Sequence, residues 1–456
     1  SLSGCAPDRC GHRHRAATAA ATALHRPHCT ACLLAMLTRI AAMLALLPLG
    51  CALLAPPHAG AGCSLLSLPY ERLHSLVGGA GAKSVWRHLR SGRDPAAAAA
   101  GADGLGAAAR ASLAAHTSPS HVAPVVREHS TSDGTRKLLL RLRDGHEVET
   151  VLIPPRPDVA GGGRARNARA RSTLCVSSQV GCRQGCRFCA TGTMGLFRSL
   201  DTDEVLAQVF AARGLAEREA LPPLSNLVFM GMGEPADNVP AVRGALAALT
   251  DRRRFGFSPR AVTVSTVAPT AAAFGALLGI GEEEAPPPPA LAWSLHAADA
   301  SLRRRLVPTA VDEPEALREG LCAALAALPP RRRRLVVEYV LLGGVNDGLA
   351  EADELAAFLR PVEAACFDPG RASRRTGVLV NLIPYNDGGG GAAARLAARY
   401  ERPTWAAIDA FQARLRQRGV WVSVRAQRGA DDSSACGQLW AQQPQARRHQ
   451  PAAGMV

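Results

Sequence analysis

The sequence predicts an α/β protein whose main domain is a partial (β/α)6 barrel, with a small helical and hairpin domain before it and a C-terminal extension after it. From residue 172 onward, six apolar β-type runs alternate with helical patterns, which is typical of a parallel sheet. Polar or glycine-rich motifs follow five of these runs, where β/α barrels build their active sites. The chain of 456 residues is long enough for two or three domains.

Residues 1–63 have the composition of a targeting segment. Residues 1–70 contain one acidic residue, Asp8, and the stretch from Met36 to Gly62 has a basic start, an apolar centre and a small-residue exit. A membrane anchor over residues 40–58 is the alternative, although three prolines interrupt it. We expect import into an organelle, a plastid rather than a mitochondrion, and no membrane in the mature form. If the segment is not a targeting sequence, the expected location is cytoplasmic.

Residues 64–154 predict the small accessory domain. Residues 68–92 have the pattern of two short helices, and an Ala/Gly-rich linker follows. Residues 122–155 alternate β-type runs with two Asp-Gly turn signals, at Asp133 and Asp144, which indicates hairpins. Residues 155–172, rich in Arg and Gly, predict an inserted basic loop.

Residues 173–418 predict the barrel. The expected strands are residues 173–177, 226–233, 261–266, 291–296, 334–342 and 377–385. Between them lie helical patterns, of which residues 201–215 begin with a capping box of Asp201 and Glu204. Residues 419–456 predict one further strand, then a loop and a tail.

Three cysteines, Cys182, Cys186 and Cys189, form the spacing CxxxCxxC directly after the first barrel strand. Three thiolates on one short loop can hold three irons of a 4Fe–4S cluster and leave the fourth iron open. A structural zinc site is the alternative, with Cys175 as its fourth ligand. Six of the thirteen cysteines precede Ser64 and four lie in residues 175–189, a distribution unlike that of a small disulfide scaffold.

Phe188 precedes the last cysteine of this motif, which then resembles the loop of radical S-adenosylmethionine (SAM) enzymes. The stretches "TLCVSSQVGCRQGCRFCATGTMG", "GMGEP", "VST", "SLH", "VEYVLLGGVND", "LIPYN" and "ACGQL" occur in the order found in the RlmN/Cfr family of RNA adenine methyltransferases. This resemblance extends from about Glu149 to Leu439. It implies a radical-SAM barrel and an enzyme that uses a 4Fe–4S cluster and two molecules of SAM per turnover.

The resemblance also implies a role for individual residues. It implies that Cys436 accepts a methyl group, that Cys175 resolves the product, and that Glu149 is the base. The implied ligands of the cluster are Cys182, Cys186 and Cys189. The implied contacts of SAM are Gly233, Glu234, Ser265, Ser294, Leu295, His296 and Asn386.

The implied mechanism avoids a chemical difficulty, because carbon 2 of adenine has no usable lone pair. Cys436 first takes a methyl group from one SAM. The cluster reduces a second SAM to a 5′-deoxyadenosyl radical, which removes hydrogen from that S-methyl group. The carbon radical adds to adenine, a base removes the ring proton, and Cys175 attacks Cys436 to form a transient disulfide that frees the product.

We therefore predict a methyltransferase for carbon 2 of adenosine in 23S-type large-subunit rRNA and also in tRNA. Methylation of carbon 8 by the same family is one alternative, although Pro235 in "GMGEP" favours carbon 2. A non-catalytic metal-binding RNA-binding protein is the other. The expected partners are rRNA, tRNA and an electron donor such as flavodoxin or ferredoxin, and the expected state is a monomer. The net charge of +15 agrees with a polyanionic partner, whereas the aromatic content of 4% gives no sign of base-stacking platforms.

Several residues have a simpler interpretation that their local sequence leaves open. Glu149 could be an exposed strand carboxylate, and His296 a hydrogen-bonded core histidine. The arginine runs 252–254, 303–305 and 331–334 could contact phosphates or simply be solvated surface. Cys322 and Cys366 lie in Ala-rich helical surroundings and are expected to be inert. Two segments depart from the family pattern, namely Ser433-Ser434 before "ACGQL" and the Gly-rich stretch after Asn386.

Overall fold

A computed structural model describes residues 64–97, 105–114, 116, 122–155, 170–367, 377–386, 399–429, 434–441 and 443. All of these residues belong to one compact unit, Gly60–Val456. The expected targeting segment, most of the basic loop, the Gly-rich stretch after Asn386, Ser433 and the C-terminal tail lie outside the described residues. In the described part of the chain, no helix is long and apolar enough to span a lipid bilayer.

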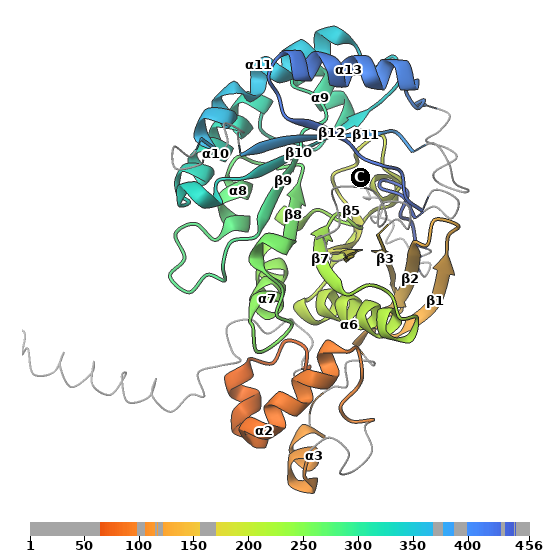
Figure 1. The fold of residues 1–456 in the computed structure, drawn as a ribbon, viewed down its shortest axis with the longest axis vertical. Helices are drawn as coiled ribbons and strands as arrows, with labels where there is room; N and C mark the ends of the chain where they lie inside the picture. The colour runs from red at the N-terminus through yellow and green to blue at the C-terminus, as the bar shows by residue number, and fades with distance from the viewer. Residues whose placement is uncertain are drawn as a thin grey trace, which may run out of the picture. The chain divides into compact units, whose positions relative to one another are not determined.

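The centre of this unit is a ten-stranded sheet with two edges, β1 and β12 (Figure 1). From β4 to β12 all neighbouring strands are parallel. The predicted parallel sheet is therefore confirmed, and the extra strand after residue 419 completes it. In sheet order the strands are β1 (Val125–Ser130), β2 (Arg136–Arg141), β3 (Glu147–Ile153), β4 (Ser172–Cys175), β7 (Leu224–Phe229), β8 (Val262–Thr266), β9 (Ala290–Ser294), β10 (Leu335–Leu341), β11 (Val378–Pro384) and β12 (Val422–Val424).

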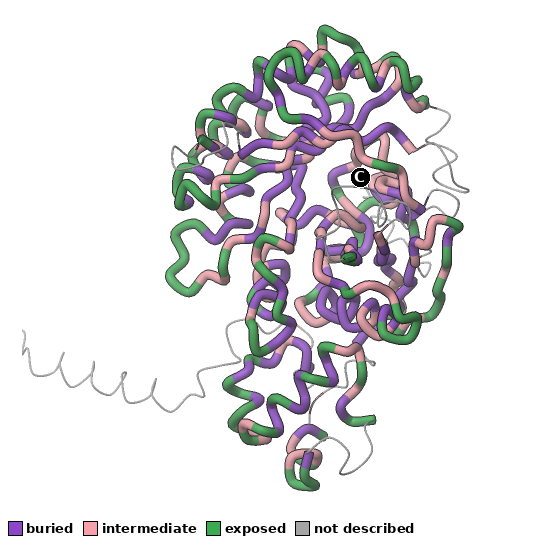
Figure 2. Tube along the Cα trace, viewed as in Figure 1, coloured by how far each residue is buried: buried purple, intermediate pink, exposed green. Residues whose placement is uncertain are grey.

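Helices cover the outer face of the parallel strands, and their exposed residues face away from the sheet (Figures 1 and 2). Residues of the strands are mostly buried, as expected for parallel strands covered on their faces. α6 begins with the predicted capping box: Asp201 accepts from the backbone N–H of Glu204, whose side chain accepts from that of Asp201. The helices are α2 (Tyr70–Arg90), α3 (Ala107–Leu113), α5 (Ala190–Met194), α6 (Thr202–Arg218), α7 (Val239–Thr250), α8 (Ala272–Leu278), α9 (Ala300–Leu306), α10 (Pro314–Ala326), α11 (Leu349–Ala365) and α13 (Trp405–Gln417).

The accessory hairpins share the sheet of the barrel. β1, β2 and β3 form an antiparallel meander, and β3 pairs antiparallel with β4. Both predicted Asp-Gly turns are present, with Gly134 and Gly145 at positive φ, a conformation that favours glycine. The two short helices expected before the meander are the halves of α2, which bends at Gly78. The boundary expected at residue 154 stays a prediction.

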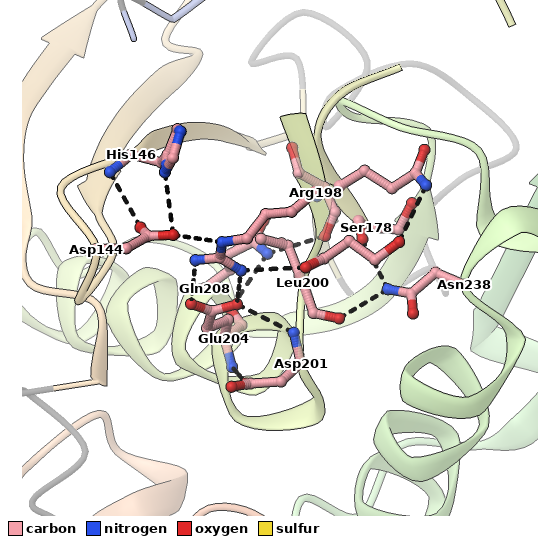
Figure 3. Close-up of polar contacts among 12 residues, drawn as sticks. Asp144, His146, Ser178, Arg198, Leu200, Asp201, Glu204, Gln208 and Asn238 are labelled. Atoms are coloured by element: carbon pink, nitrogen blue, oxygen red, sulfur yellow. Dashed lines mark hydrogen bonds and ion pairs between the residues drawn. The ribbon is translucent and has the colours of Figure 1, made fainter. Parts of the chain in front are cut away.

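A polar network joins the meander to the barrel (Figure 3). Arg198 of the strand β6 (Gly195–Ser199) makes ion pairs with Asp144 of the β2–β3 turn and with Glu204 of α6. Asn238, at the start of α7, donates to the carbonyls of Ser178 and Leu200, at 2.8 Å each. β6 pairs with β5 (Gln179–Cys182) in a two-stranded ribbon, so these contacts fix the ribbon that precedes and follows the cysteine motif.

Candidate active site

The carboxyl ends of the parallel strands surround a cavity, which we call the central cavity. Strand ends meet at one edge of a parallel sheet, so residues distant in sequence share its wall. The predicted site residues in this wall are Cys182, Cys186, Cys189, Gly233, Glu234, Ser265, Ser294, His296, Asn386 and Cys436. Leu295 does not line the cavity: its side chain is fully buried in the apolar core, and its backbone N–H donates to the carbonyl of Glu338. The contact of Leu295 with SAM that the resemblance implies stays a prediction.

The cysteine loop, residues 182–189, lies between the β5–β6 ribbon and α5. Gly181 has φ +75°, and a Cβ atom there would lie 1.9 Å from the carbonyl oxygen of Gly195, so only glycine fits. Gln184 stabilises the loop with two hydrogen bonds. Its side-chain amide donates to the carboxylate of Asp237 (2.7 Å), and its backbone carbonyl accepts from the hydroxyl of Thr309 (2.7 Å). The three thiols thus lie at the cavity wall on a short, well-supported turn.

The chemistry of these thiols fits an iron–sulfur cluster. Burial raises the pKa of Cys182, Cys186 and Cys189, and the negative charge of neighbouring thiols raises that of the first two further. A site of three thiolates therefore needs added positive charge, which the irons of a 4Fe–4S cluster would supply. Within the described residues, no three His, Cys, Asp or Glu side chains are placed to hold a single metal ion.

The loop after β7 places Gly233 and Glu234 beside the ribbon. Gly233 has φ +98°, and a Cβ atom there would lie 2.6 Å from that of Gln179, so a larger residue would clash. The Glu234 carboxylate accepts from the backbone N–H groups of Val267 (3.0 Å) and Ala236 (2.9 Å). Burial raises the pKa of Glu234 to about 7, despite these hydrogen bonds. Glu234 therefore connects the ends of β7 and β8.

His296 has features of both a hydrogen-bonded core histidine and a residue of the site. Its Nδ1 accepts from the backbone N–H of Val340 (3.1 Å), as a core histidine would, yet it also lines the central cavity. Its φ of 66° is unusual for a residue with a side chain. Burial, with the charge of Arg303, lowers the pKa of His296 to about 3, so the ring is neutral at physiological pH. Ser265 and Ser294 are hydrogen-bonded to each other at 3.0 Å nearby.

The C-terminal segment, residues 434–441 and 443, brings Cys436 to this cavity. Asn386 donates to the carbonyl of Cys436 (3.0 Å), and the N–H of Ala190 donates to that of Gly437 (2.7 Å). The hydroxyl of Thr191 donates to the carbonyl of Leu439 (2.6 Å). The segment is thereby attached both to the end of β11 and to α5, which directly follows the cysteine loop.

A second cavity, the side cavity, adjoins the first. Cys175, at the end of β4, lines it, and Cys436 lines both cavities. Both thiols are free. Burial, with the nearby Cys436 sulfur, raises the pKa of Cys175 to about 12. The two cysteines, far apart in sequence, therefore share one cavity wall.

Glu149 is not an exposed strand carboxylate. Its side chain is buried and forms an ion pair with Lys137 (3.2 Å), while it accepts from the backbone N–H of Trp440 (2.9 Å). Glu149 thus attaches the C-terminal segment to β3. This contact joins residues 149 and 440, so the local sequence contains no sign of it.

Two arginines of the predicted runs are buried, which corrects both interpretations of those positions. Arg303 donates to the carbonyls of Leu295 (2.6 Å) and Val267 (2.5 Å), and Arg254 donates to that of Leu66 (2.6 Å). Sequence analysis also missed Arg425, which lines both cavities. Arg425 lies in the predicted last strand region, and the only hint was a charged residue at the end of an apolar run.

Comparisons with known proteins agree with this geometry. A dual-specificity RNA methyltransferase RlmN of Sorangium cellulosum is 39% identical over 381 residues, 78% of this chain and 87% of that protein. The RlmN of Geotalea uraniireducens is 39% identical over 312 residues, 68% of this chain and 76% of that protein. The crystal structure of a radical SAM methyltransferase from Sphaerobacter thermophilus covers 83% of this chain and 99% of that one, with a TM-score of 0.63 and 34% identity. No protein-family model matches. By these similarities the chain belongs to the RlmN family of radical SAM RNA methyltransferases.

Proposed function

We propose that this enzyme methylates carbon 2 of adenosine in large-subunit rRNA and in tRNA. The relatives are named dual-specificity RNA methyltransferases, which supports two RNA substrates. The observation that carries the proposal is that Cys436 lines both cavities, with the cysteine loop in the wall of one and Cys175 in the wall of the other.

In this proposal the cysteine loop holds a 4Fe–4S cluster, which together with bound SAM supplies a radical able to remove hydrogen from a methyl group. Gly233, Glu234 and the Ser265–Ser294 pair line the same cavity and are suited to bind the polar groups of SAM. Asn386 lines the cavity proposed for SAM, and its side-chain amide also donates to the backbone carbonyl of Cys436, the proposed carrier of the methyl group.

Cys436 carries the methyl carbon and Cys175 releases the product. The adduct of the carbon radical must give up one electron, which the oxidised cluster would accept. Once Glu149 has also taken the proton from the ring carbon, Cys175 attacks the sulfur of Cys436 as a thiolate. A sulfur–sulfur bond forms as the bond from that sulfur to the methylene carbon breaks, and the carbon keeps the electron pair and takes up a proton to become the methyl group. The shared wall of the side cavity supports this step, because the two sulfurs must meet.

The test is methylation in vitro with product identification. Anaerobically reconstituted protein should bind about four irons, cleave SAM under reduction and convert adenosine in an rRNA fragment and in tRNA to 2-methyladenosine, identified by nucleoside mass spectrometry. Formation of 8-methyladenosine would contradict the assignment to carbon 2. A colourless, zinc-containing protein that binds RNA without cleaving SAM would contradict the enzyme itself.

We also propose a plastid location, a monomeric state and reduction by a flavodoxin or ferredoxin. The near absence of acidic residues in residues 1–70 supports organelle import. Fusion of residues 1–63 to a fluorescent protein should send it to the plastid, and fluorescence spread through the cytosol would contradict that location.

A further inference from the structure

Arg425 lines the same cavity walls as the two proposed reacting sulfurs. It directly follows β12, and its backbone N–H donates to the carbonyl of Leu382 in β11 (2.8 Å). This hydrogen bond fixes the position of its backbone. The side chain is partly buried and lines both the central and the side cavity. One guanidinium nitrogen lies 3.8 Å from the sulfur of Met230, which lines both cavities as well.

Arg425 shares the side cavity with Cys175 and both cavities with Cys436. The groups that act on it electrostatically are Cys436, Glu338 and Cys175. Glu338 is buried, and its carboxylate accepts from Asn381 (2.8 Å). Within the described part of the chain, Arg425 forms no ion pair. Arg428 in the same cavity differs, because it forms an ion pair with Asp133 (2.9 Å).

Cys175 needs a nearby cation if it is to act as a nucleophile. The thiolate is the attacking form of cysteine, and burial disfavours it. Cys436 also disfavours a charge on Cys175, and Arg425 favours it. The charged side chains on β2 and β3 are all paired: Lys137 with Glu149, Arg141 with Glu147, and Arg136 with Glu219 of the segment after α6. Met230, after β7, adds only an uncharged side chain and a backbone contact.

We infer that Arg425 is a positioning residue for the sulfur pair, whose guanidinium stabilises the thiolate of Cys175 when that sulfur attacks Cys436. This inference rests on the proposed function, which it deepens. It assigns Arg425 no contact with RNA and no bond to the reacting atoms. Glu338 lines the central cavity together with Arg425, and its negative charge offsets part of the effect of the guanidinium.

The test measures the rate at which iodoacetamide alkylates Cys175 as a function of pH. The full chain is purified anaerobically, and peptide mass spectrometry separates Cys175 from the other cysteines. Because the pKa of Cys175 lies far above neutral pH, the accessible range covers only the rising part of the profile, where the rate is proportional to the thiolate fraction. In Arg425→Gln we expect alkylation to slow about tenfold throughout this range. Arg425→Lys, which keeps the charge, should stay close to the unchanged protein. Glu338→Gln should speed alkylation.

Arg428→Gln is the matched control, because it removes an arginine from the same cavity whose charge is already paired. Its alkylation rate should not change. If Arg425→Gln leaves the rate unchanged, or if Arg425→Lys slows alkylation as much as Arg425→Gln does, Arg425 acts only by packing and the inference fails. If Arg425→Gln does not fold, an unchanged rate in Glu338→Gln contradicts the inference instead. Alkylation requires neither RNA nor methyl transfer, so a negative result here contradicts the role of Arg425 without contradicting the proposed function.

Discussion

The cysteine loop and the Cys175–Cys436 pair are assembled in opposite ways. The loop thiols come from one continuous stretch, residues 182–189, although Gln184 also links it to Asp237 and Thr309. The pair comes from the first barrel strand and the end of the chain, and it depends on contacts of the C-terminal segment that include those with Asn386, Ala190, Thr191 and Glu149. Chain connectivity therefore keeps the loop thiols near one another, whereas the pair meets only if the fold brings its two segments together.

The largest effect should follow from a change in the loop. Cys186→Ala removes one of three thiolate ligands, so we expect loss of the cluster and of all SAM cleavage, more than about 1,000-fold. Iron analysis and detection of 5′-deoxyadenosine measure both. Cys322→Ala is a control outside both cavities and should keep its iron. Full iron content in Cys186→Ala would show that the loop is not the iron site.

Substitutions of Cys436 and Cys175 should separate methyl transfer from product release, whereas a change in the loop should abolish both. Cys436→Ala should abolish methyl transfer, because no sulfur remains to carry the carbon. Cys175→Ala should instead trap RNA covalently on Cys436, since nothing resolves the adduct. Denaturing gels with labelled RNA detect the trapped species, and iron content should be normal in both variants. A Cys175→Ala protein that turns over normally would exclude the two-sulfur mechanism.

Glu149 has two separable functions to test, because its carboxylate attaches the C-terminal segment to β3 and is also the proposed base. Glu149→Gln alone leaves Lys137 without its carboxylate, which can cost about 3–5 kcal/mol for a buried pair. In Lys137→Met/Glu149→Gln that cost is relieved, and Gln can still accept from Trp440. We expect methylation to fall by about 100- to 10,000-fold, the usual contribution of general base catalysis, with near-normal thermal stability.

The same double variant can also contradict the role of Glu149 as the base. If it methylates RNA within tenfold of the unchanged enzyme, Glu149 only attaches the C-terminal segment to β3. The Lys137→Met/Glu149→Met protein, which lacks the acceptor for Trp440 as well, should then lose activity through the segment. Hydrogen exchange at the amide of Trp440 reports that attachment independently of methylation.

The smallest effect should come from one hydrogen bond of the segment. Thr191→Val leaves the carbonyl of Leu439 without its 2.6 Å donor, a change worth about 1–3 kcal/mol for a buried group. We expect slower formation of the Cys175–Cys436 disulfide under diamide, with unchanged iron content. Thr250→Val is the matched control, because its buried hydroxyl also donates to a backbone carbonyl (2.7 Å) but lies in α7. Equal disulfide rates in the two variants would show that Thr191 does not position Cys436.

The arginines show how far residue type alone can be interpreted. Arg252, Arg253 and Arg254 are consecutive in sequence, yet the first two are exposed and Arg254 is buried against Trp86. Arg303 is fully buried, whereas Arg304 and Arg305 are exposed. A run of three charged residues carries no periodic signal that says which one turns inward. Its neighbours in space decide, here the carbonyls at the ends of β8 and β9.

The sequence by itself determined the positions of the barrel strands, both Asp-Gly turns, the capping box of α6 and the cysteine loop. Each of these depends on residues close together in the chain, so periodicity, turn residues and spacing are sufficient to predict them. Family resemblance added Cys175, Cys436 and Glu149 as residue types at matching positions.

Only the tertiary structure decided that Cys175 and Cys436 share a cavity wall, that Arg425 lies in that wall, and that Glu149 holds Trp440. It also places the side chain of Leu295 in the apolar core. These facts follow from the parallel register of β4 through β12 and from the path of residues 434–443 across the strand ends. Such contacts join residues hundreds of positions apart, and no local pattern records a contact that only packing creates.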